Sequence, residues 1–393
     1  MSAFLVDWLN LAFRWAHLVV GIGWIGTSFY FIALDLSLRK REGMREGVYG
    51  TAWEVHGGGF YHVEKYLLAP RTLPPDLVWY KWEAYLTWVT GFALLILQYY
   101  WRADTFLISR SVLPMLPAQA IVISVASLAA SWLVYNGLCK SPVGQNTTLL
   151  AVILFALLVA AAWGYGSVFS GRGALIHVGA LIGTIMAFNV FGIIIPNQKK
   201  IVASLMANEA PDPALGAVSK QRSVHNNYLT LPVLVLMVSN HYPMLTGQAH
   251  LWMVVGLIIV AGAAVRHFLN RHDAGDPFFK IAWTLPVVAV AFGAAIYLTA
   301  PASNASFAGI EVTDGEALNI VGRHCVMCHS ARPSHEGFEV APKDVVLTTI
   351  PDIRRHAAGI MAQAVNGNAM PIGNETLMTA EERQALGAFL TNR

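Results

Sequence analysis

Seven long stretches of this chain contain no Asp, Glu, Lys or Arg, and no other feature of the sequence limits its fold as strongly. They cover residues 15–34, 84–101, 111–139, 141–171, 173–198, 223–265 and 281–310. A helix needs about 20 mainly apolar residues to cross the roughly 30 Å hydrocarbon core of a bilayer. Because every stretch approaches or exceeds that length, we expect helices that cross a membrane.

The stretch over residues 223–265 is long enough for two crossings, and residues 240–248 in its middle are rich in turn formers. The predicted fold class is therefore all-α, with an eight-helix transmembrane bundle as a catalytic domain over residues 1–300. The helices are expected near residues 9–34, 82–101, 117–139, 148–169, 174–195, 228–245, 249–269 and 281–300. Short matches between the two halves, such as Tyr85–Thr87 with Tyr228–Thr230, favour two four-helix repeats.

The composition excludes several other classes of protein. Charged residues make up 12% of the chain, whereas soluble proteins carry about 25%. With this little charge and three cysteines, the chain is neither a single soluble domain, nor disordered, nor a disulfide-stapled secreted module. A formal net charge of +3 is too small and too dispersed to predict nucleic-acid binding.

The distribution of Lys and Arg predicts the orientation of the bundle, because cytoplasmic loops retain these residues. One set of alternate loops, together with the end of the helix before residues 270–280, holds fifteen: Arg39, Lys40, Arg41, Arg45, Lys65, Arg71, Lys81, Lys140, Lys199, Lys200, Lys220, Arg222, Arg266, Arg271 and Lys280. The other set holds three: Arg102, Arg110 and Arg172. With eight spans, both ends of the chain are expected on the non-cytoplasmic side of a multi-pass membrane protein.

The composition changes after residue 300. Residues 301–313 are predicted to be a short exposed linker, and residues 314–393 have the charge density of a small soluble domain. A domain of this size rarely has a sufficient hydrophobic core and usually needs a cofactor or staple. We therefore expect a cofactor in the C-terminal segment.

A C-x-x-C-H motif, Cys325–His329, supplies a candidate for that cofactor. Two thiols at this spacing can form thioethers to a porphyrin, and the adjacent histidine then reaches the iron. A redox dithiol or half of a zinc site would also use C-x-x-C, but no second cysteine pair follows. The motif predicts one covalent haem c, held by Cys325, Cys328 and His329, in a class I cytochrome c domain.

A haem of the Met/His type also needs a methionine on the opposite face of the iron. Met370 lies in a turn-rich segment that ends in Met370-Pro371 and is favoured as this ligand, with Met361 as the alternative. His329 and Met370 are thus the predicted metal ligands. Thr379 and Glu382 have the spacing of a capping box at the start of the last helix. His324, like His335 and His356, is interpreted as a solvated surface residue.

Polar side chains inside a membrane are costly and usually serve a function. Arg14 and His17 are three positions apart, so they share one face of the first predicted helix. Other polar residues in the predicted spans or at their ends are Glu83, His177, Asn189, His225, Asn226, Asn227 and His267. Facing histidines in such a bundle are able to hold a b-type haem. The alternative is that they bond neighbouring helices or line a water-filled cavity.

Three segments, 14–30, 54–61 and 325–329, resemble the bacterial membrane-bound urate oxidases (urate hydroxylases). The first begins Arg-Trp-Ala-His and ends Gly-Trp-Ile-Gly-Thr-Ser-Phe-Tyr, and the second reads Glu-Val-His-Gly-Gly-Gly-Phe-Tyr. That family joins an eight-helix N-terminal domain to a cytochrome c, and the resemblance covers essentially the whole chain. It implies an inner-membrane oxidoreductase with a periplasmic cytochrome domain, which acts in purine catabolism.

The resemblance further implies that urate is oxidised to 5-hydroxyisourate, with electrons passed to the fused haem and a respiratory acceptor rather than to oxygen. Urate is a planar anion rich in hydrogen-bonding groups, so its site should offer a cation, amide donors and a base. We hypothesise that Arg14 pairs with the anion, that His17 or His177 acts as base or haem ligand, and that Glu83 and Asn226 bond the ring. Two other classes stay open: a quinol or other dehydrogenase with a fused cytochrome, and a transporter or anchor that carries an electron-transfer domain.

Overall fold

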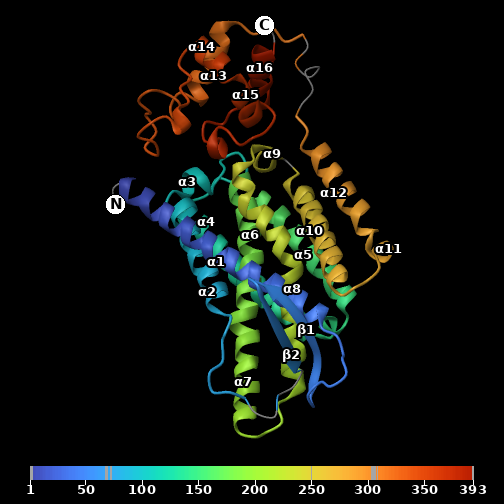
Figure 1. Cartoon of the computed structure of the whole chain (residues 1–393). Coiled ribbons are helices and arrows are strands. Elements are labelled where there is room, and N and C mark those ends of the chain that lie inside the picture. Colours follow the sequence, from blue (N-terminus) through green and yellow to red (C-terminus); the bar gives the residue numbers. More distant parts are fainter. Residues whose placement is uncertain are drawn as a thin grey trace.

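A computed structural model of the chain describes residues 3–66, 70, 73–248, 250–301, 307 and 309–391. It is mostly helical, with 69% helix and 5% strand (Figure 1). Within these residues the prediction of a helical protein is confirmed, and the small strand content was not predicted. Arg71, residue 249 of one predicted helix, and residues 302–306 and 308 of the predicted linker lie outside the described residues.

Helices occur at all eight predicted positions. They are α1 (Ala3–Ser37), α2 (Trp82–Leu95) with the π-turn η1 (Ile96–Tyr100), α4 (Pro117–Lys140), α5 (Thr147–Gly166), α6 (Gly171–Asn189), α8 (Pro213–Val238), α10 (Leu251–Asp273) and α12 (Thr284–Leu298). The π-turn η3 (Val190–Ile194) joins α6 to α7 (Ile195–Met206). Short helices α3 (Ala103–Phe106), α9 (Pro243–Thr246) and α11 (Phe278–Ile281) lie between the long ones.

Six helical segments of the described chain are long and apolar enough to cross a membrane, which is compatible with a membrane protein. They are Phe4–Ser37, Pro117–Lys140, Thr147–Gly166, Gly171–Met206, Leu251–Asp273 and Phe278–Leu298. The other two expected spans, α2 and α8, are not among these six segments, and the length of one and the polarity of the other explain why. The α-helical part of α2 has only 14 residues, and α8 begins with a polar half that contains Lys220 and Arg222. The eight-span topology therefore stays a prediction.

Two of the fifteen cations that predicted the orientation are buried in the bundle. Arg222 is 1% exposed, and its guanidinium lies over the Tyr135 ring, 4.9 Å from the centroid. Arg266 is 3% exposed and lies 3.9 Å from the Phe29 centroid. Arg222 belongs to α8, so its assignment to a loop was wrong, whereas Arg266 lies in α10, at the helix position that was predicted for it.

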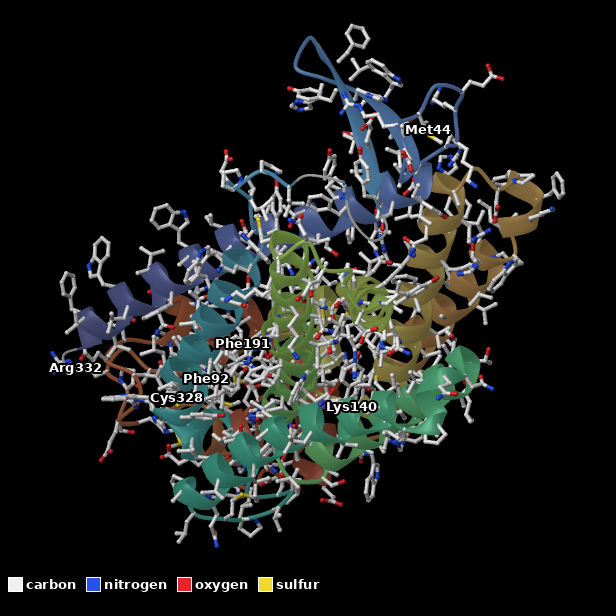
Figure 2. The ribbon with its side chains drawn as sticks, turned by 90° about the horizontal axis from the view of Figure 1, so that it is seen from below. Met44, Phe92, Lys140, Phe191, Cys328 and Arg332 are labelled. Carbon is white, nitrogen blue, oxygen red and sulfur yellow. The ribbon has the colours of Figure 1, made fainter. Side chains whose placement is uncertain are left out.

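Helix α6 runs through the centre of the bundle and is the most buried of the long helices (Figure 2). It packs against α2, α4, α5 and α8. Its start is fixed locally, because the Ser170 hydroxyl caps the helix by accepting from the Gly173 N–H at 3.0 Å. Because the cap fixes the residue at which α6 begins, it also fixes where the polar residues of this helix lie along the bundle.

A β-hairpin, β1 (Val48–His56) with β2 (Gly59–Tyr66), follows α1 and stands at the edge of the bundle (Figure 2). Gly57 and Gly58 form its two-residue loop with φ of +59° and +81°. Positive φ at both loop positions is the requirement of a type I′ turn, which glycine meets without strain. The hairpin is held to α1 by an ion pair between Lys65 and Asp35.

The C-terminal segment, residues 309–391, has its own hydrophobic cluster. It contains α13 (Asp314–His324), α14 (Ile350–Arg355), α15 (Ala357–Ile360) and α16 (Ala380–Thr391). Ile320, Val321, Ile353, Leu386 and Phe389 are buried together in this cluster, separate from the core of the bundle. The domain boundaries proposed from the sequence stay a prediction.

The C-terminal segment sits on the end of the bundle formed by α3 and α9, whereas the hairpin and α7 lie at the opposite end (Figure 1). Among the described residues, two backbone hydrogen bonds join the parts: Asn368 N–H donates to the Gly247 carbonyl at 3.1 Å, and Arg110 N–H donates to the Gly373 carbonyl at 3.1 Å. We call this contact the junction.

Candidate functional site

His177 on α6 is a fully buried polar residue of the bundle, with 0% of its surface exposed. Its Nδ1 lies 2.7 Å from the Gly173 carbonyl, and its Nε2 lies 2.6 Å from the Ser124 hydroxyl. Because a carbonyl only accepts, Nδ1 carries the proton, and in the neutral imidazole Nε2 accepts from Ser124. The Ser124 oxygen then accepts from the Tyr100 hydroxyl at 2.6 Å. We call this directed chain of hydrogen bonds, Tyr100–Ser124–His177, the His177 relay.

Aromatic rings surround the His177 imidazole. The Phe169, Tyr165 and Tyr99 ring centroids lie 4.7, 5.4 and 6.3 Å from that of His177. The Tyr99 hydroxyl in turn accepts from the Asn240 amide at 2.5 Å. These rings keep bulk water from the relay, so its hydrogen bonds operate in a low-dielectric environment.

Arg14 and His17 lie on α1 and face α2 rather than His177. His17 Nδ1 is 3.0 Å from both the Thr87 carbonyl and the Thr90 hydroxyl. Gly91 makes room for the imidazole, since a Cβ there would lie 2.9 Å from His17 Cε1. Arg14 is exposed, and its Nε and one Nη lie 3.2 and 3.3 Å from the Gln98 amide group, with the amide oxygen turned toward the cation. Among the described residues, no hydrogen bond joins His17 to His177.

Glu83 is half-buried in the first turn of α2, and its Cγ lies 3.6 Å from the position a Cβ would take on Gly23 of α1. It therefore packs at the α1–α2 contact. The structure does not place it with His177 or with Asn226.

Asn226, the last of the five predicted catalytic residues, belongs to a second polar network. Its Nδ2 donates to the Met186 carbonyl, and its Oδ1 accepts from Asn189 Nδ2, each at 3.0 Å. Asn189 also donates to the Tyr135 hydroxyl at 2.9 Å, and that hydroxyl contacts His225 Nδ1 at 2.7 Å. His177 and Asn189 are twelve positions apart on α6, so the two networks lie about 18 Å apart along the helix.

Asn226 also lines a cavity of about 500 Å³ near the hairpin end of the bundle. Trp24, Phe31 and Trp79 are among its aromatic lining residues, and Lys65 and Asp35 also line it. The single cation among its lining residues is ion-paired to Asp35. This cavity is large enough for a small planar ligand but offers little net positive charge.

The five predicted catalytic residues thus do not form one site: three lie where α1 meets α2, one lies in the His177 relay and one lies in the Asn226 network. His177 and Asn226 belong to buried polar networks, whereas Ser124, Tyr100 and Tyr135 of the same networks were not among the predicted site residues. The only sequence signal for Ser124 and Tyr100 is weak: each places a hydroxyl group in a stretch without charged residues. The b-type haem stays a prediction.

The residues of the C-x-x-C-H motif and their surroundings fit a c-type haem. His329 Nδ1 donates to the Val345 carbonyl at 2.9 Å, which fixes the ring and leaves Nε2 available as a ligand. Cys325 and Cys328 are not joined by a disulfide. Burial raises the pKa of Cys325 to about 11 and also raises the pKa of Cys328. Cys325 and Met370 pack against the same hydrophobic cluster, so these residues fit a haem held between His329 and Met370.

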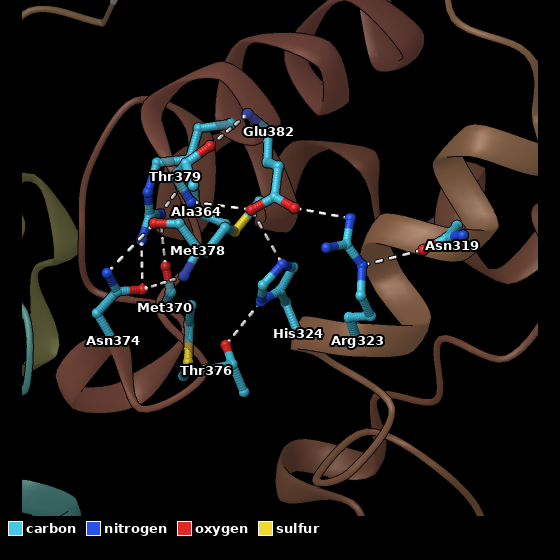
Figure 3. A network of polar contacts seen from close by, with 11 residues as sticks. Asn319, Arg323, His324, Ala364, Met370, Asn374, Thr376, Met378, Thr379 and Glu382 are labelled. Atoms are coloured by element: carbon cyan, nitrogen blue, oxygen red, sulfur yellow. Dashed lines mark hydrogen bonds and ion pairs between the residues drawn. The ribbon is translucent and has the colours of Figure 1, made fainter.

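Arg383 fixes the loop that carries Met370. It is 8% exposed, and one Nη donates to the Met370 carbonyl at 2.7 Å and to the Ala364 carbonyl at 2.5 Å (Figure 3). Desolvation lowers the pKa of Arg383. A charged donor that bonds two carbonyls makes strong hydrogen bonds, so Met370 is held on a defined backbone.

A second polar group joins α13 to α16 beside this loop (Figure 3). His324 is 6% exposed, with Nδ1 2.7 Å from the Thr376 hydroxyl and Nε2 3.1 Å from a Glu382 carboxylate oxygen. The expectation that His324 is solvated was therefore wrong. The predicted capping box is confirmed, since Thr379 N–H donates to Glu382 at 2.9 Å and Glu382 N–H donates to the Thr379 hydroxyl at 3.2 Å.

Comparison with known proteins places the bundle in a family. The family described as urate oxidase N-terminal matches residues 3–299. The chain belongs to the urate oxidase N-terminal family. No curated protein and no solved structure matches the chain. Membership points to an oxidoreductase with a urate-related function, and the matched region contains the bundle with both of its polar networks.

Proposed function

We propose that this protein is a membrane-bound urate oxidase whose C-terminal segment is a cytochrome c that receives the electrons. The observation that carries the proposal is the junction: a segment with a haem-attachment motif packs directly on a urate oxidase family bundle. The bond from Asn368 to Gly247 comes two residues before Met370, so the proposed ligand loop is itself part of the contact.

The reaction requires a two-electron acceptor system and a proton acceptor. Urate and water give 5-hydroxyisourate, two protons and two electrons, so each product molecule needs two one-electron transfers. A c-type haem bound at Cys325 and Cys328, with His329 and Met370 as ligands, would supply one-electron acceptance and later pass each electron to a respiratory acceptor.

The chain's own residues have distinct roles in this proposal. His329 is held by Val345 and Met370 by Arg383, so both ligand positions are preorganised. The His177 relay is oriented to take up a proton, because His177 Nε2 accepts through Ser124 from Tyr100. A base enclosed in this way transfers protons only along its hydrogen bonds, which protects reactive intermediates from bulk water.

The membrane orientation follows the loop cations. The C-terminal segment, the connection between α2 and α4 that contains Arg102 and Arg110, and the first turn of α6 with Arg172 lie at one end of the bundle, opposite the hairpin and α7 (Figure 1). We propose that this end faces the periplasm across the inner membrane of a bacterium, where covalent haem attachment takes place.

Purified protein tests the proposal. A pyridine haemochrome assay should count one c-type haem per chain and reveal whether a b-type haem is present. Anaerobic addition of urate should then reduce the c haem, whereas a quinol should not do so faster. A Cys325→Ala, Cys328→Ala variant, which has no thioether attachment, should give no urate-dependent haem signal. If dithionite reduces the haem and urate does not, the proposed function is wrong.

A further inference from the structure

A cavity of about 390 Å³ lies at the junction and is lined by both parts of the chain. The bundle contributes Phe169, Arg172 and Thr246, and the C-terminal segment contributes Asn368, Asn374 and Arg383. None of Cys325, Cys328, His329 or Met370 lines it, so it is separate from the proposed haem site. Its volume is in the range of small-molecule sites, about 300–1,000 Å³.

The electrostatics of this junction cavity favour an anion. Its two charged lining residues are Arg172 and Arg383, and no Asp or Glu is among the described residues that line it. Arg172 is in the first turn of α6, a 19-residue helix whose N-terminal dipole adds positive potential. The cavity at the hairpin end differs, because its one lysine is already paired with Asp35.

Two polar atoms at the junction cavity lack a partner. Thr246 is 3% exposed, and its hydroxyl has no hydrogen-bond partner among the described residues. The buried Arg172 Nε likewise has none in the described part of the chain. Buried polar groups are nearly always hydrogen-bonded, and leaving one unpaired is costly. Both residues line the cavity, and a small rotation of each side chain toward it would let a polar anionic ligand satisfy the unpaired hydroxyl and guanidinium N–H.

One wall of the cavity adjoins the His177 relay. Phe169 lies in this wall, is itself 0% exposed, and has its ring centroid 4.7 Å from that of His177. On the other side, Ala369 and Asn368 precede Met370 in the chain. A ligand here lies between the His177 relay and the loop that carries the proposed haem ligand.

We propose that the junction cavity binds a small planar organic anion, with Arg172 and Thr246 as binding residues. Under the proposed function, on which the identity of the ligand rests, this anion is urate. The site is accordingly not formed by Arg14, His17, Glu83 and Asn226, which lie elsewhere in the bundle. Substrate bound at the junction is oxidised next to the electron-accepting segment. Electrons then need no carrier to cross the bundle from the Asn226 network to the His177 relay.

The test compares Arg172→Gln with Arg110→Gln in the full-length holoprotein. Arg110 is an exposed cation at the same end of the bundle, and its side chain does not line the cavity. Urate-dependent haem reduction should show a KM raised about tenfold or more for Arg172→Gln, because a charge-assisted hydrogen bond is lost, and a change below about twofold for Arg110→Gln. Thr246→Val should raise the KM about threefold or more without loss of stability, since the hydroxyl has no partner within the described residues.

Binding without turnover separates this inference from the proposed function. Equilibrium dialysis of urate against fully reduced protein measures binding when no oxidation can follow. Weaker binding by Arg172→Gln than by Arg110→Gln supports the junction site. Equal KM and equal binding in both variants, or no urate bound by the wild-type protein, overturns it. If urate binds through Arg172 but never reduces the haem, the site stands and the proposed function fails.

Discussion

Replacing Ser124 with alanine tests the His177 relay at its centre. The Ser124 side chain is fully buried, and its oxygen lies 2.6 Å from both the Tyr100 hydroxyl and His177 Nε2. Without it, His177 keeps its bond to Gly173, but Nε2 loses its donor and Tyr100 loses its acceptor. The void left by one oxygen atom is too small to hold a replacement water.

The expected loss of stability follows from those two bonds. Hydrogen bonds between helices in a membrane contribute about 0.6 kcal/mol on average and up to roughly 1.7. Two such losses should therefore lower the free energy of unfolding by about 1–3 kcal/mol. Loss of a proton-transfer residue commonly costs about 10²- to 10⁴-fold in rate, so urate turnover should fall at least tenfold.

Stopped-flow reduction of the c haem by urate, at a series of pH values, measures the rate, and urea unfolding measures the stability. Ser127→Ala is a matched control: its hydroxyl lies on the same helix and contacts Tyr165 at 2.7 Å, but it is not part of the relay. Equal turnover and equal stability in the two variants would refute the reasoning. A less stable Ser124→Ala protein with normal turnover would limit the relay to a structural role.

Three further predictions concern the junction and the C-terminal segment. Gly247→Ala would bring a Cβ to 2.7 Å from the Asn368 nitrogen, so this overpacking should weaken the junction by about 1–3 kcal/mol and slow urate-driven haem reduction, while dithionite reduction stays normal. Met370→Ala should change the potential and spectrum of the haem, and Met361→Ala should not, since Met370 packs with Cys325 against one cluster. Burial opposes ionisation of Glu382, but bonds from Thr379 and His324 outweigh it and lower the pKa of this carboxyl. Its stabilising effect is therefore present at neutral pH and lost as the pH falls through that lowered pKa, so the stability difference between wild type and Glu382→Gln should shrink in acid unfolding titrations.

The sequence predicted the positions of the long helices because hydrophobic length is a local property. It did not predict the hairpin, although Gly57 and Gly58 supply a two-residue turn between alternating residues. The loop assignment of Arg222 failed because hydropathy alone does not show that α8 begins at Pro213, before the apolar stretch.

The candidate sites were less predictable than the fold because they combine residues from separate elements. His177 was visible as a polar residue in an apolar span, but Ser124 and Tyr100 come from two other helices. The sequence around His324 predicts a surface residue, because only the fold brings Glu382 of α16 next to it. The junction cavity depends on how the C-terminal segment packs on α3, α6 and α9, which no local pattern encodes.

The central claim is that urate oxidised in the bundle delivers its electrons to the C-terminal haem. The stoichiometry of anaerobic haem reduction by limiting urate, with the product followed in the same reaction, tests this claim most directly. The account predicts that each urate consumed reduces two c-type haems and yields one 5-hydroxyisourate. Consumption of urate while the haem stays oxidised, or formation of peroxide in its place when oxygen is admitted, would contradict it.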